Sequence, residues 1–234
     1  MVEQVWRFSK SKKWKFEIIP VDDRSTDKTV NILQSLGKKY SEVHPIFRRK
    51  DKEEKGNTMG KALALGTKTA KGETVIWTMG DLADDPQTYS KIVEKIEAGY
   101  DLVFGSRYMP GGSRGNLDRL KAFLSSWGTR FARLLFGIPV HDITNAFRGF
   151  KKEVFLDLKL DSPGFSISPE FAIKAHLKGY KLGEVPTVYT NRKEGISNFK
   201  LYNTTKSYLK VYWKLFWQYK ILPFFPVPIK SGAD

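Results

Sequence analysis

The sequence predicts an α/β protein whose mostly parallel sheet is flanked by helices, and three observations favour this fold class. Short apolar runs that have the length of buried strands alternate along the chain with helical segments. Apolar residues make up 41% of the chain, which is enough to bury a core. Polar motifs follow three of the apolar runs directly, at Asp22-Asp23, Asp81 to Asp85 and Ser106-Arg107. Because ligands bind beyond the carboxyl ends of strands in such sheets, we expect these motifs to form a site.

The first half of the chain predicts a regular alternation of elements. Residues 2–8 have the pattern of the end of a helix, and Thr26 or Asp27 can cap a second helix whose apolar face includes Leu33 and Leu36. A third helix is expected at 58–69 and a short one after Pro86. Strands are expected at 16–21, 43–47, 74–78 and 102–104.

The second half predicts two helices with bulky apolar faces. A helix is expected over 119–136, ending at Gly137, and it carries basic residues beside its aromatic ones. Such a helix can lie in a membrane interface or form part of a core, and we favour the core. The segment 201–219 predicts an amphipathic helix in which aromatic residues are interleaved with lysines. The other expected elements are a short strand near 148–150, a helix at 169–178 and an edge strand at 182–189 that contains Pro186.

Composition narrows the classes of function. The chain has 234 residues and no cysteine, which excludes disulfides and thiolate metal sites. A formal net charge of +15 attracts polyanions such as nucleic acid, anionic lipid or phosphorylated small molecules, although a lysine-rich solvated surface has the same charge. No leader sequence is expected, and the most apolar stretch, 211–229, is interrupted by Lys214, Gln218 and Lys220. We therefore expect a cytoplasmic protein that sits peripherally on a membrane.

Several motifs together resemble one enzyme family. The segment Val21-Asp22-Asp23-Arg24-Ser25-Thr26-Asp27-Lys28-Thr29 resembles the VDDGSTDGT motif of inverting family 2 glycosyltransferases with the GT-A fold. The GSRY and GG of residues 101–112, Asp142 with Phe147-Arg148-Gly149-Phe150, and Arg192 with Gly195 and Ser197 resemble the dolichyl-phosphate or polyprenyl-phosphate mannose or glucose synthase branch. The resemblance runs from about residue 18 to 199. It implies a glycosyltransferase domain over 1–200, followed by an amphipathic C-terminal segment over 201–234.

The resemblance implies the transfer of mannose or glucose from GDP-mannose or UDP-glucose to a polyprenyl phosphate at a membrane surface. Asp22 and Asp23 would hold the nucleoside, and Asp81 would bind Mg²⁺ or Mn²⁺ at the diphosphate. Asp84 is expected to replace a lost metal ligand. Alternatively, Asp84 or Asp85 is an acidic residue at a helix N-terminus, where it interacts favourably with the helix dipole. Arg107 would contact the reacting phosphates. The acceptor phosphate would be bound by Arg119, Arg192 and Ser197.

Other interpretations of these residues remain open. Asp22 and Asp23 can form a turn that leads into a helix, single arginines are often only solvated, and Asp142 and Arg148 can belong to internal ion pairs. A non-lipid acceptor, or a non-catalytic protein of this fold that binds a partner or a membrane, are the alternative functions. Nucleic-acid binding is a third, which the charge alone suggests.

Two features depart from the family pattern. The family begins with a strand that carries a Pro-x-Tyr-Asn-Glu type motif, and this motif is missing ahead of the helix at 2–8. A missing central strand would leave a gap in the sheet and expose apolar surface. The usual Asp-x-Asp motif reads Met79-Gly80-Asp81, so Met79 stands in place of one acidic ligand. These two departures motivate the non-catalytic alternative.

Overall fold

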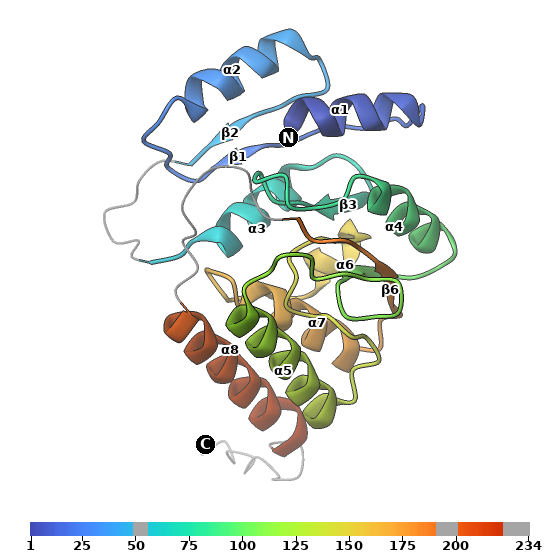
Figure 1. Ribbon diagram of the computed structural model, residues 1–234, viewed down its shortest axis with the longest axis vertical. Coiled ribbons are helices and arrows are strands. Elements are labelled where there is room, and N and C mark those ends of the chain that lie inside the picture. Colours follow the sequence, from blue (N-terminus) through green and yellow to red (C-terminus); the bar gives the residue numbers. More distant parts are fainter. Residues whose placement is uncertain (49–55, 191–200, 222–234) are drawn as a thin grey trace, which may run out of the picture.

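A computed structural model describes residues 1–48, 56–190 and 201–221, and it confirms an α/β architecture. Helices flank strands throughout, as Figure 1 shows. The helices of the described residues are α1 (Val2–Ser11), α2 (Thr29–Lys39), α3 (Met59–Thr69), α4 (Gln87–Glu97), α5 (Arg119–Phe136), α6 (Lys152–Asp157), α7 (Ile167–Leu177) and α8 (Leu201–Phe216), which continues into a π-helical turn, η1 (Trp217–Ile221). The strands are β1 (Val21–Asp22), β2 (Ile46–Phe47), β3 (Thr74–Trp77), β4 (Leu102–Ser106), β5 (Arg148–Lys151) and β6 (Leu182–Pro186).

The described strands form two separate sheets. β1 and β2 pair in parallel, and a four-stranded sheet has the order β3-β5-β4-β6. In this larger sheet β4 and β6 are parallel, whereas β5 runs antiparallel to both of its neighbours. The expected edge position of the strand with Pro186 is confirmed, because β6 lies at the end of the order. No strand of the described residues joins β1 to β3.

The main core packs aromatic rings between the larger sheet and the helices beside it. Trp77 of β3 makes an edge-to-face contact with Phe150 of β5 at 5.1 Å between ring centroids, and Phe171 of α7 lies 4.9 Å from Phe150. The Trp77 indole also donates a hydrogen bond to Thr67 of α3 at 2.8 Å. On the other face, a Cβ at Gly149 would come within 2.3 Å of Ile92, so glycine allows α4 to pack directly on β5. This core therefore holds β3 and β4, the strands that end at two of the three motifs.

Helix α5 has the bounds that the sequence predicts, but most of its bulky side chains are not in the core. Asp118 caps its start by accepting a hydrogen bond from the Lys121 amide at 3.0 Å, and Gly137 ends it with a left-handed φ of 73°. The buried residues of α5 are mainly small, at Ala122, Thr129 and Ala132 together with Phe136. The favoured core role is thus wrong for the large residues that are 39–81% exposed, namely Leu120, Phe123, Trp127, Phe131 and Leu134.

Helix α8 packs beside α5, at the end of the molecule opposite α1 and α2 (Figure 1). Its Tyr212 and Leu215 are buried in the main core, and the rings of Tyr212 and Phe131 lie 6.2 Å apart. Its other face exposes aromatic residues, including Trp213 at 64%. None of the helices in the described ranges has both the length and the apolar character needed to cross a bilayer.

Candidate active site

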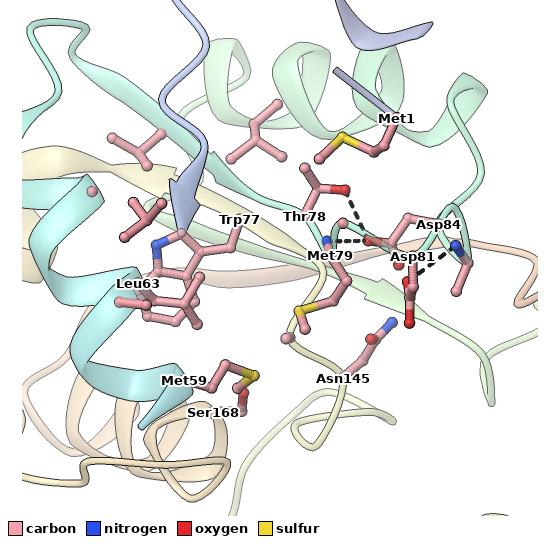
Figure 2. Close-up of a pocket in the computed structure, with 18 of the residues that line it drawn as sticks. Met1, Met59, Leu63, Trp77, Thr78, Met79, Asp81, Asp84, Asn145 and Ser168 are labelled. Atoms are coloured by element: carbon pink, nitrogen blue, oxygen red, sulfur yellow. Dashed lines mark hydrogen bonds between the residues drawn. The ribbon is translucent and has the colours of Figure 1, made fainter. Parts of the chain in front are cut away.

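The three strand-end motifs line one large cavity. This cavity has a volume of about 2670 Å³, and its walls include Asp22, Asp23, Asp81, Asp84 and Arg107. They reach it from the ends of β1, β3 and β4, as a site beyond the carboxyl edge of a sheet requires. Figure 2 shows Asp81 and Asp84 beside Thr78 and Met79, with Asn145 nearby. Residues of all three motifs therefore line the same cavity.

At the end of β1, the two adjacent aspartates have different surroundings. Asp22 is 5% exposed; its Oδ2 accepts a hydrogen bond from the Ser25 amide at 3.3 Å, while its Oδ1 is buried with no partner among the described residues. Asp23 accepts from Arg48 at 2.5 Å and from the Thr58 hydroxyl at 2.6 Å. A buried carboxylate oxygen without a donor carries a desolvation cost until a ligand supplies one. Asp22 is therefore the better placed of the two to receive a donor group from a ligand.

The turn after these aspartates is held in an unusual conformation. Arg24 occupies the position that is glycine in the VDDGSTDGT motif, and its φ of 70° lies in the left-handed region. This conformation costs a residue with a Cβ roughly 1–2 kcal/mol. The Arg24 guanidinium donates to the Thr58 hydroxyl at 2.5 Å and lies 3.3 Å from the Asp23 carboxylate. These side-chain contacts offset part of the backbone strain and fix the turn against the start of α3.

The acidic loop after β3 places its three aspartates in different directions. Asp85 accepts from the Gln87 amide at 3.1 Å and from the Thr88 hydroxyl at 3.3 Å, so it caps the start of α4. Asp84 turns inward and accepts from the Thr78 hydroxyl at 2.9 Å and the Met79 amide at 3.0 Å. Asp81 accepts from the Ala83 amide at 3.2 Å and faces the cavity. The helix-start role therefore fits Asp85, and Asp84 and Asp81 share the cavity wall.

Burial changes the proton affinity of Asp84. Its desolvation raises the pKa of the carboxyl to about 6, and the negative charge of Asp81 adds to this effect. The hydrogen bonds from Met79 and Thr78 and the positive charge of Arg107 act in the opposite direction. A divalent cation beside Asp81 and Asp84 would favour the ionised form.

These two carboxylates fit the binding of Mg²⁺ or Mn²⁺ to a diphosphate. Hard cations prefer oxygen ligands, and Mg²⁺ is commonly held by one or two carboxylates together with substrate phosphates and water. Within the described ranges no three acidic or histidine side chains converge on one point, so a metal cage made of protein groups alone is not present there. The pKa of Asp84 is raised mainly by its burial and to a smaller extent by the charge of Asp81.

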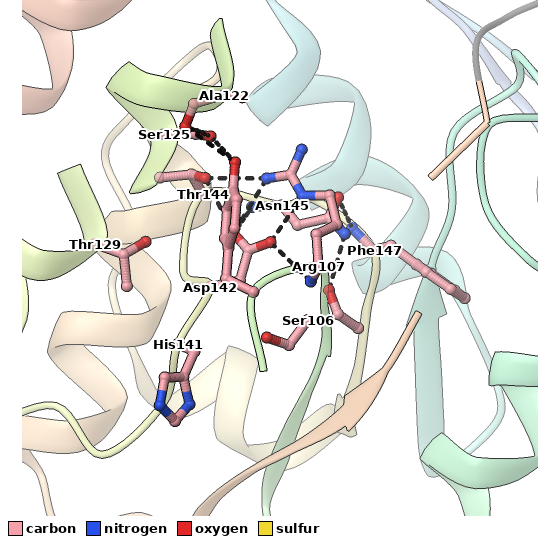
Figure 3. Close-up of polar contacts among 12 residues, drawn as sticks. Ser106, Arg107, Ala122, Ser125, Thr129, His141, Asp142, Thr144, Asn145 and Phe147 are labelled. Atoms are coloured by element: carbon pink, nitrogen blue, oxygen red, sulfur yellow. Dashed lines mark hydrogen bonds and ion pairs between the residues drawn. The ribbon is translucent and has the colours of Figure 1, made fainter. Parts of the chain in front are cut away.

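At the end of β4, Arg107 forms a buried ion pair with Asp142. Its Nε lies 2.7 Å from Asp142 Oδ2, and one Nη donates to Asp142 Oδ1 at 3.1 Å and to the Thr144 hydroxyl at 3.2 Å (Figure 3). The Arg107 side chain is 9% exposed and that of Asp142 is fully buried. Burial acts to lower the pKa of Arg107, but the adjacent carboxylate raises it, so the guanidinium stays charged. The guanidinium group of Arg107 has five N–H donors, and the contacts above use only those on Nε and one Nη. The donors on the other Nη remain for a ligand in the cavity.

The ion pair that the sequence left open for Asp142 is therefore made with Arg107. Arg148 is fully buried and instead donates to main-chain carbonyls, to Ser168 at 2.8 Å, to Ile143 at 3.1 Å and to Asn145. Its guanidinium also lies 4.8 Å from the ring centroid of Phe104. Burial lowers the pKa of Arg148, which receives only distant support from Asp142. Arg148 thus stabilises the loop that carries Asp142 through hydrogen bonds to the carbonyls of that loop.

Of the three residues predicted to bind the acceptor phosphate, the structure describes only Arg119. Arg119 is exposed at the start of α5 and is absent from the cavity wall, whereas Lys121 lines it. A helix turns 100° per residue, so these two side chains point in nearly opposite directions. Arg192 and Ser197 lie outside the described residues. Their roles remain predictions.

Polar residues of the loop before β5 also line the cavity wall, and they were not predicted. Thr144 and Asn145 belong to the loop before β5, and Asn145 donates to the Gly105 carbonyl at 2.9 Å. The loop Asp142-Ile143-Thr144-Asn145 precedes a strand that runs antiparallel to β3 and β4. Its position at the same sheet edge follows from that strand direction, which the sequence does not reveal.

Comparison with known proteins identifies clear relatives. The sequence pattern of the family described as "Glycosyl transferase family 2" matches residues 2–158. The chain is 30% identical over 198 residues to a polyprenol monophosphomannose synthase of Mycolicibacterium smegmatis, covering 83% of this chain and 74% of that protein. It is 33% identical over 189 residues to a dolichol-phosphate mannosyltransferase of Pyrococcus furiosus, covering 79% of this chain and 51% of the relative. The chain thus spans about half the length of that second relative.

Solved structures show the same fold. A glucosyl-3-phosphoglycerate synthase of Mycobacterium tuberculosis in complex with phosphoglyceric acid superposes with a TM-score of 0.63 at 15% identity, covering 85% of this chain and 68% of the other. The complex of that synthase with Mn²⁺, UDP-glucose and phosphoglyceric acid gives a TM-score of 0.61 at 16% identity, with the same coverage. At this level of identity the likeness concerns the GT-A fold alone.

Proposed function

The chain belongs to glycosyl transferase family 2, and on that premise we propose that it moves a hexose from a nucleotide diphosphate sugar to a polyprenyl phosphate at a membrane surface. The observation that carries this proposal is the convergence of Asp22, Asp81, Asp84 and Arg107 on one cavity. Two relatives at 30–33% identity are named for mannose transfer to polyprenol or dolichol phosphate. Mannose from GDP-mannose is therefore the first donor to test, and glucose from UDP-glucose the second.

The donor nucleotide would contact the end of β1. The unpartnered Oδ1 of Asp22 can accept a hydrogen bond from a base N–H or a ribose hydroxyl. Asp23 keeps Arg48 and Thr58 in place and would contact the nucleoside with its remaining acceptor capacity. This division of roles follows from the different burial of the two side chains.

The diphosphate would lie between the acidic loop and Arg107. Asp81 and Asp84 would hold Mg²⁺ or Mn²⁺, which would neutralise the charge that develops on the leaving nucleoside diphosphate. The free donors of Arg107 would bind a phosphate oxygen, and the Asp142 carboxylate fixes their direction. Asn145 is positioned by Gly105 and would contact the donor beside Asp81.

The chemistry itself would require little proton transfer. A polyprenyl phosphate is anionic at neutral pH, so its oxygen can attack the anomeric carbon in line, with inversion, without a strong general base. The chain's residues would act by positioning and by stabilising charge. Arg119, Arg192 and Ser197 are the proposed ligands of the acceptor phosphate.

A labelled-sugar assay tests this function. Vesicles that contain a polyprenyl phosphate, incubated with the protein, Mn²⁺ and labelled GDP-mannose or UDP-glucose, should yield lipid-linked sugar from one donor. Asp81→Asn should lower kcat/KM about 100-fold or more because it weakens the charge at the diphosphate. Asp85→Asn is the matched control, since Asp85 serves the start of α4 and should leave kcat/KM within a few-fold. Absence of product from both donors would count against the proposal.

The exposed faces of α5 and α8 are the proposed contact with the membrane. We call this surface the α5–α8 aromatic face; its exposed apolar residues are Leu120, Phe123, Trp127, Phe131, Leu134, Tyr202, Leu209 and Trp213. Exposed basic residues lie among them, at Arg130, Arg133, Lys206, Lys210 and Lys214. A face of this composition suits the boundary between anionic headgroups and acyl chains.

Vesicle binding tests this contact directly. The Trp127→Ser/Trp213→Ser variant should lose affinity for phosphatidylcholine vesicles containing phosphatidylglycerol by about tenfold or more, because two large apolar side chains no longer leave water. Leu156→Ser is the control, since Leu156 is 55% exposed on α6, outside this face. Equal loss in both variants would argue against the α5–α8 aromatic face as the contact.

A non-catalytic binding role is the second candidate. Met79 favours it, because this residue stands where the usual Asp-x-Asp has its first acidic residue. Titration calorimetry with GDP and UDP in the presence of Mn²⁺ separates the two candidates. Metal-dependent nucleotide binding supports the transferase, and its absence together with retained vesicle binding supports the second candidate.

A further inference from the structure

We propose that Tyr89 is a positioning residue for the metal ligand Asp84, and that it acts through the hydroxyl group of Thr78. A chain of two hydroxyl groups runs from Tyr89 through Thr78 to one carboxylate oxygen of Asp84 and leaves the other oxygen for a cation in the cavity. The inference rests on the proposed function in one respect, because it takes Asp84 as a ligand of Mg²⁺ or Mn²⁺.

Asp84 uses only one of its two carboxylate oxygens for contacts with the described residues. Its Oδ2 accepts hydrogen bonds from the Thr78 hydroxyl at 2.9 Å and from the Met79 amide at 3.0 Å, as Figure 2 shows. Its Oδ1 accepts no hydrogen bond from a residue in the described ranges, and Asp84 lines the cavity. The two donors on Oδ2 therefore set the direction of Oδ1, which is the oxygen that a hard cation would bind.

The number of protons fixes the direction of each hydrogen bond in this chain. Thr78 has one hydroxyl proton, and an ionised carboxylate can only accept, so the Thr78 proton goes to Asp84. The hydroxyl groups of Tyr89 and Thr78 lie 2.8 Å apart, and Tyr89 must then be the donor of that contact. The order is Tyr89 Oη–H, Thr78 Oγ1–H and Asp84 Oδ2. Each hydrogen bond in such a chain polarises the next one.

Packing on two sides holds the Tyr89 ring in place. The side chain is 5% exposed, and its ring centroid lies 5.8 Å from that of Phe8 in α1 and 5.2 Å from that of Phe147, just before β5. Phe147 in turn packs on β4, since a Cβ at Gly105 would come within 2.9 Å of its ring. The position of the Tyr89 hydroxyl is therefore set by α1, β4 and the loop before β5, and not by Thr78 alone.

The direction of Asp84 matters because the cavity offers a cation few carboxylates. Met79 has no carboxylate, and its amide instead holds Asp84 against the backbone. Within the described ranges no three acidic or histidine side chains converge on one point, so a cation at this wall would depend on Asp81 and Asp84. Partners that orient metal ligands typically change metal affinity by 10–100-fold. The hydroxyl chain is such a partner for Asp84.

A purely structural role is the alternative for Tyr89, because a buried hydroxyl needs a hydrogen-bond partner wherever it lies. The two roles predict different measurements. Loss of a structural contact lowers the free energy of unfolding and leaves the Mn²⁺ affinity of the folded protein unchanged. Loss of a positioning contact lowers the Mn²⁺ affinity as well.

Titration with Mn²⁺ in the presence of GDP or UDP, followed by electron paramagnetic resonance of the free ion, tests the proposal. Thr78→Val keeps the shape of the side chain without the hydroxyl and should weaken Mn²⁺ binding about tenfold or more. Tyr89→Phe keeps the ring and should weaken it about threefold or more. The double variant should lose no more than Thr78→Val alone, because Tyr89 acts only through Thr78. Thr78→Ser restores the hydroxyl and should stay within about twofold of the unsubstituted chain.

Tyr180→Phe is the matched control. The Tyr180 hydroxyl also donates to an aspartate, Asp157, but neither residue belongs to the cavity wall, so Mn²⁺ affinity should not change. Unchanged affinity in Tyr89→Phe would overturn the inference and leave the proposed function standing, and so would additive losses in the double variant. Absence of Mn²⁺ binding by the unsubstituted chain with either nucleotide would overturn both the inference and the metal-dependent transferase.

Discussion

The buried pair of Arg107 and Asp142 allows a quantitative test of what holds the site together. The Asp142→Ala change removes a carboxylate that accepts from Nε at 2.7 Å and from one Nη at 3.1 Å of Arg107. Both side chains are nearly or fully buried, at 9% and 0% exposure. Removing one member of a buried pair leaves an uncompensated charge and typically costs 3–5 kcal/mol. Asp142 also accepts from the amides of Arg107 and Asn145, so we expect a loss of about 4 kcal/mol in the free energy of unfolding.

Urea unfolding followed by tryptophan fluorescence measures this loss. A domain of this size has a total stability of about 5–15 kcal/mol, so such a loss should move the unfolding midpoint well outside error. The exposed pair of Glu3 and Lys39, at 40% and 61% exposure, provides the comparison. Glu3→Ala should leave the midpoint nearly unchanged, because water screens that pair.

The double variant Arg107→Met/Asp142→Ala distinguishes the cost of an unpaired Arg107 charge from the cost of the cavity that Asp142→Ala creates. If the unpaired charge dominates, the double variant should recover part of the stability that Asp142→Ala loses. An Asp142→Ala loss below about 1 kcal/mol would refute this account, because it would put the buried pair in the range of a surface contact.

Three further predictions follow from the same geometry. Burial raises the pKa of Asp84 from its usual 3.8 to about 6, so the stability that this group contributes is fully present below pH 3.8 and is lost as the pH rises through 6; Asp84→Asn should therefore raise the free energy of unfolding at pH 7.5, by roughly 3 kcal/mol at most, and flatten the decline of stability between pH 4 and 7. Arg148→Lys should destabilise the protein nearly as much as Arg148→Met, by about 3–5 kcal/mol in urea unfolding, because an ammonium group cannot reach the carbonyls of Ser168 and Ile143 together. Gly137→Ala should cost about 1–2 kcal/mol in the same assay because φ is 73° there, and a cost near zero would show that the end of α5 relaxes.

Helical segments were largely predictable because each is encoded locally. The expected 119–136 helix has the observed bounds, since an N-cap aspartate and a left-handed glycine mark its ends. The face that it buries was not predictable. Its buried positions are mostly small, at Ala122 and Ala132, whereas Trp127 and Leu134 are exposed. The spacing of apolar residues indicates that a helix has an apolar side. It does not indicate whether that side is buried in the protein core or exposed at its surface.

The site was predictable in outline, but its pairings were not. Motifs at strand ends converge because parallel strands end at one edge, so Asp22, Asp81 and Arg107 were placed together correctly. The pairing of Asp142 with Arg107 was not predicted, because this contact spans 35 residues of sequence. The exposure of Arg119 beside the inward Lys121 depends on the rotation of α5, which packing against α8 and α7 determines.

The charges of the site together explain why a cation would be needed at its centre. The Arg107 charge is matched by the fully buried Asp142, so this pair adds little net positive charge to the cavity. Asp81 and Asp84 add negative charge at the opposite side, enough to help raise the pKa of Asp84. The chain's net charge of +15 can attract a polyanion from a distance, but a diphosphate arriving between these groups would meet more negative than positive charge. A divalent cation held by Asp81 and Asp84 would reverse that balance at the point where the leaving group must be stabilised. The Asp81→Asn variant is therefore the decisive test of the proposed activity, and a substitution of a surface lysine is not.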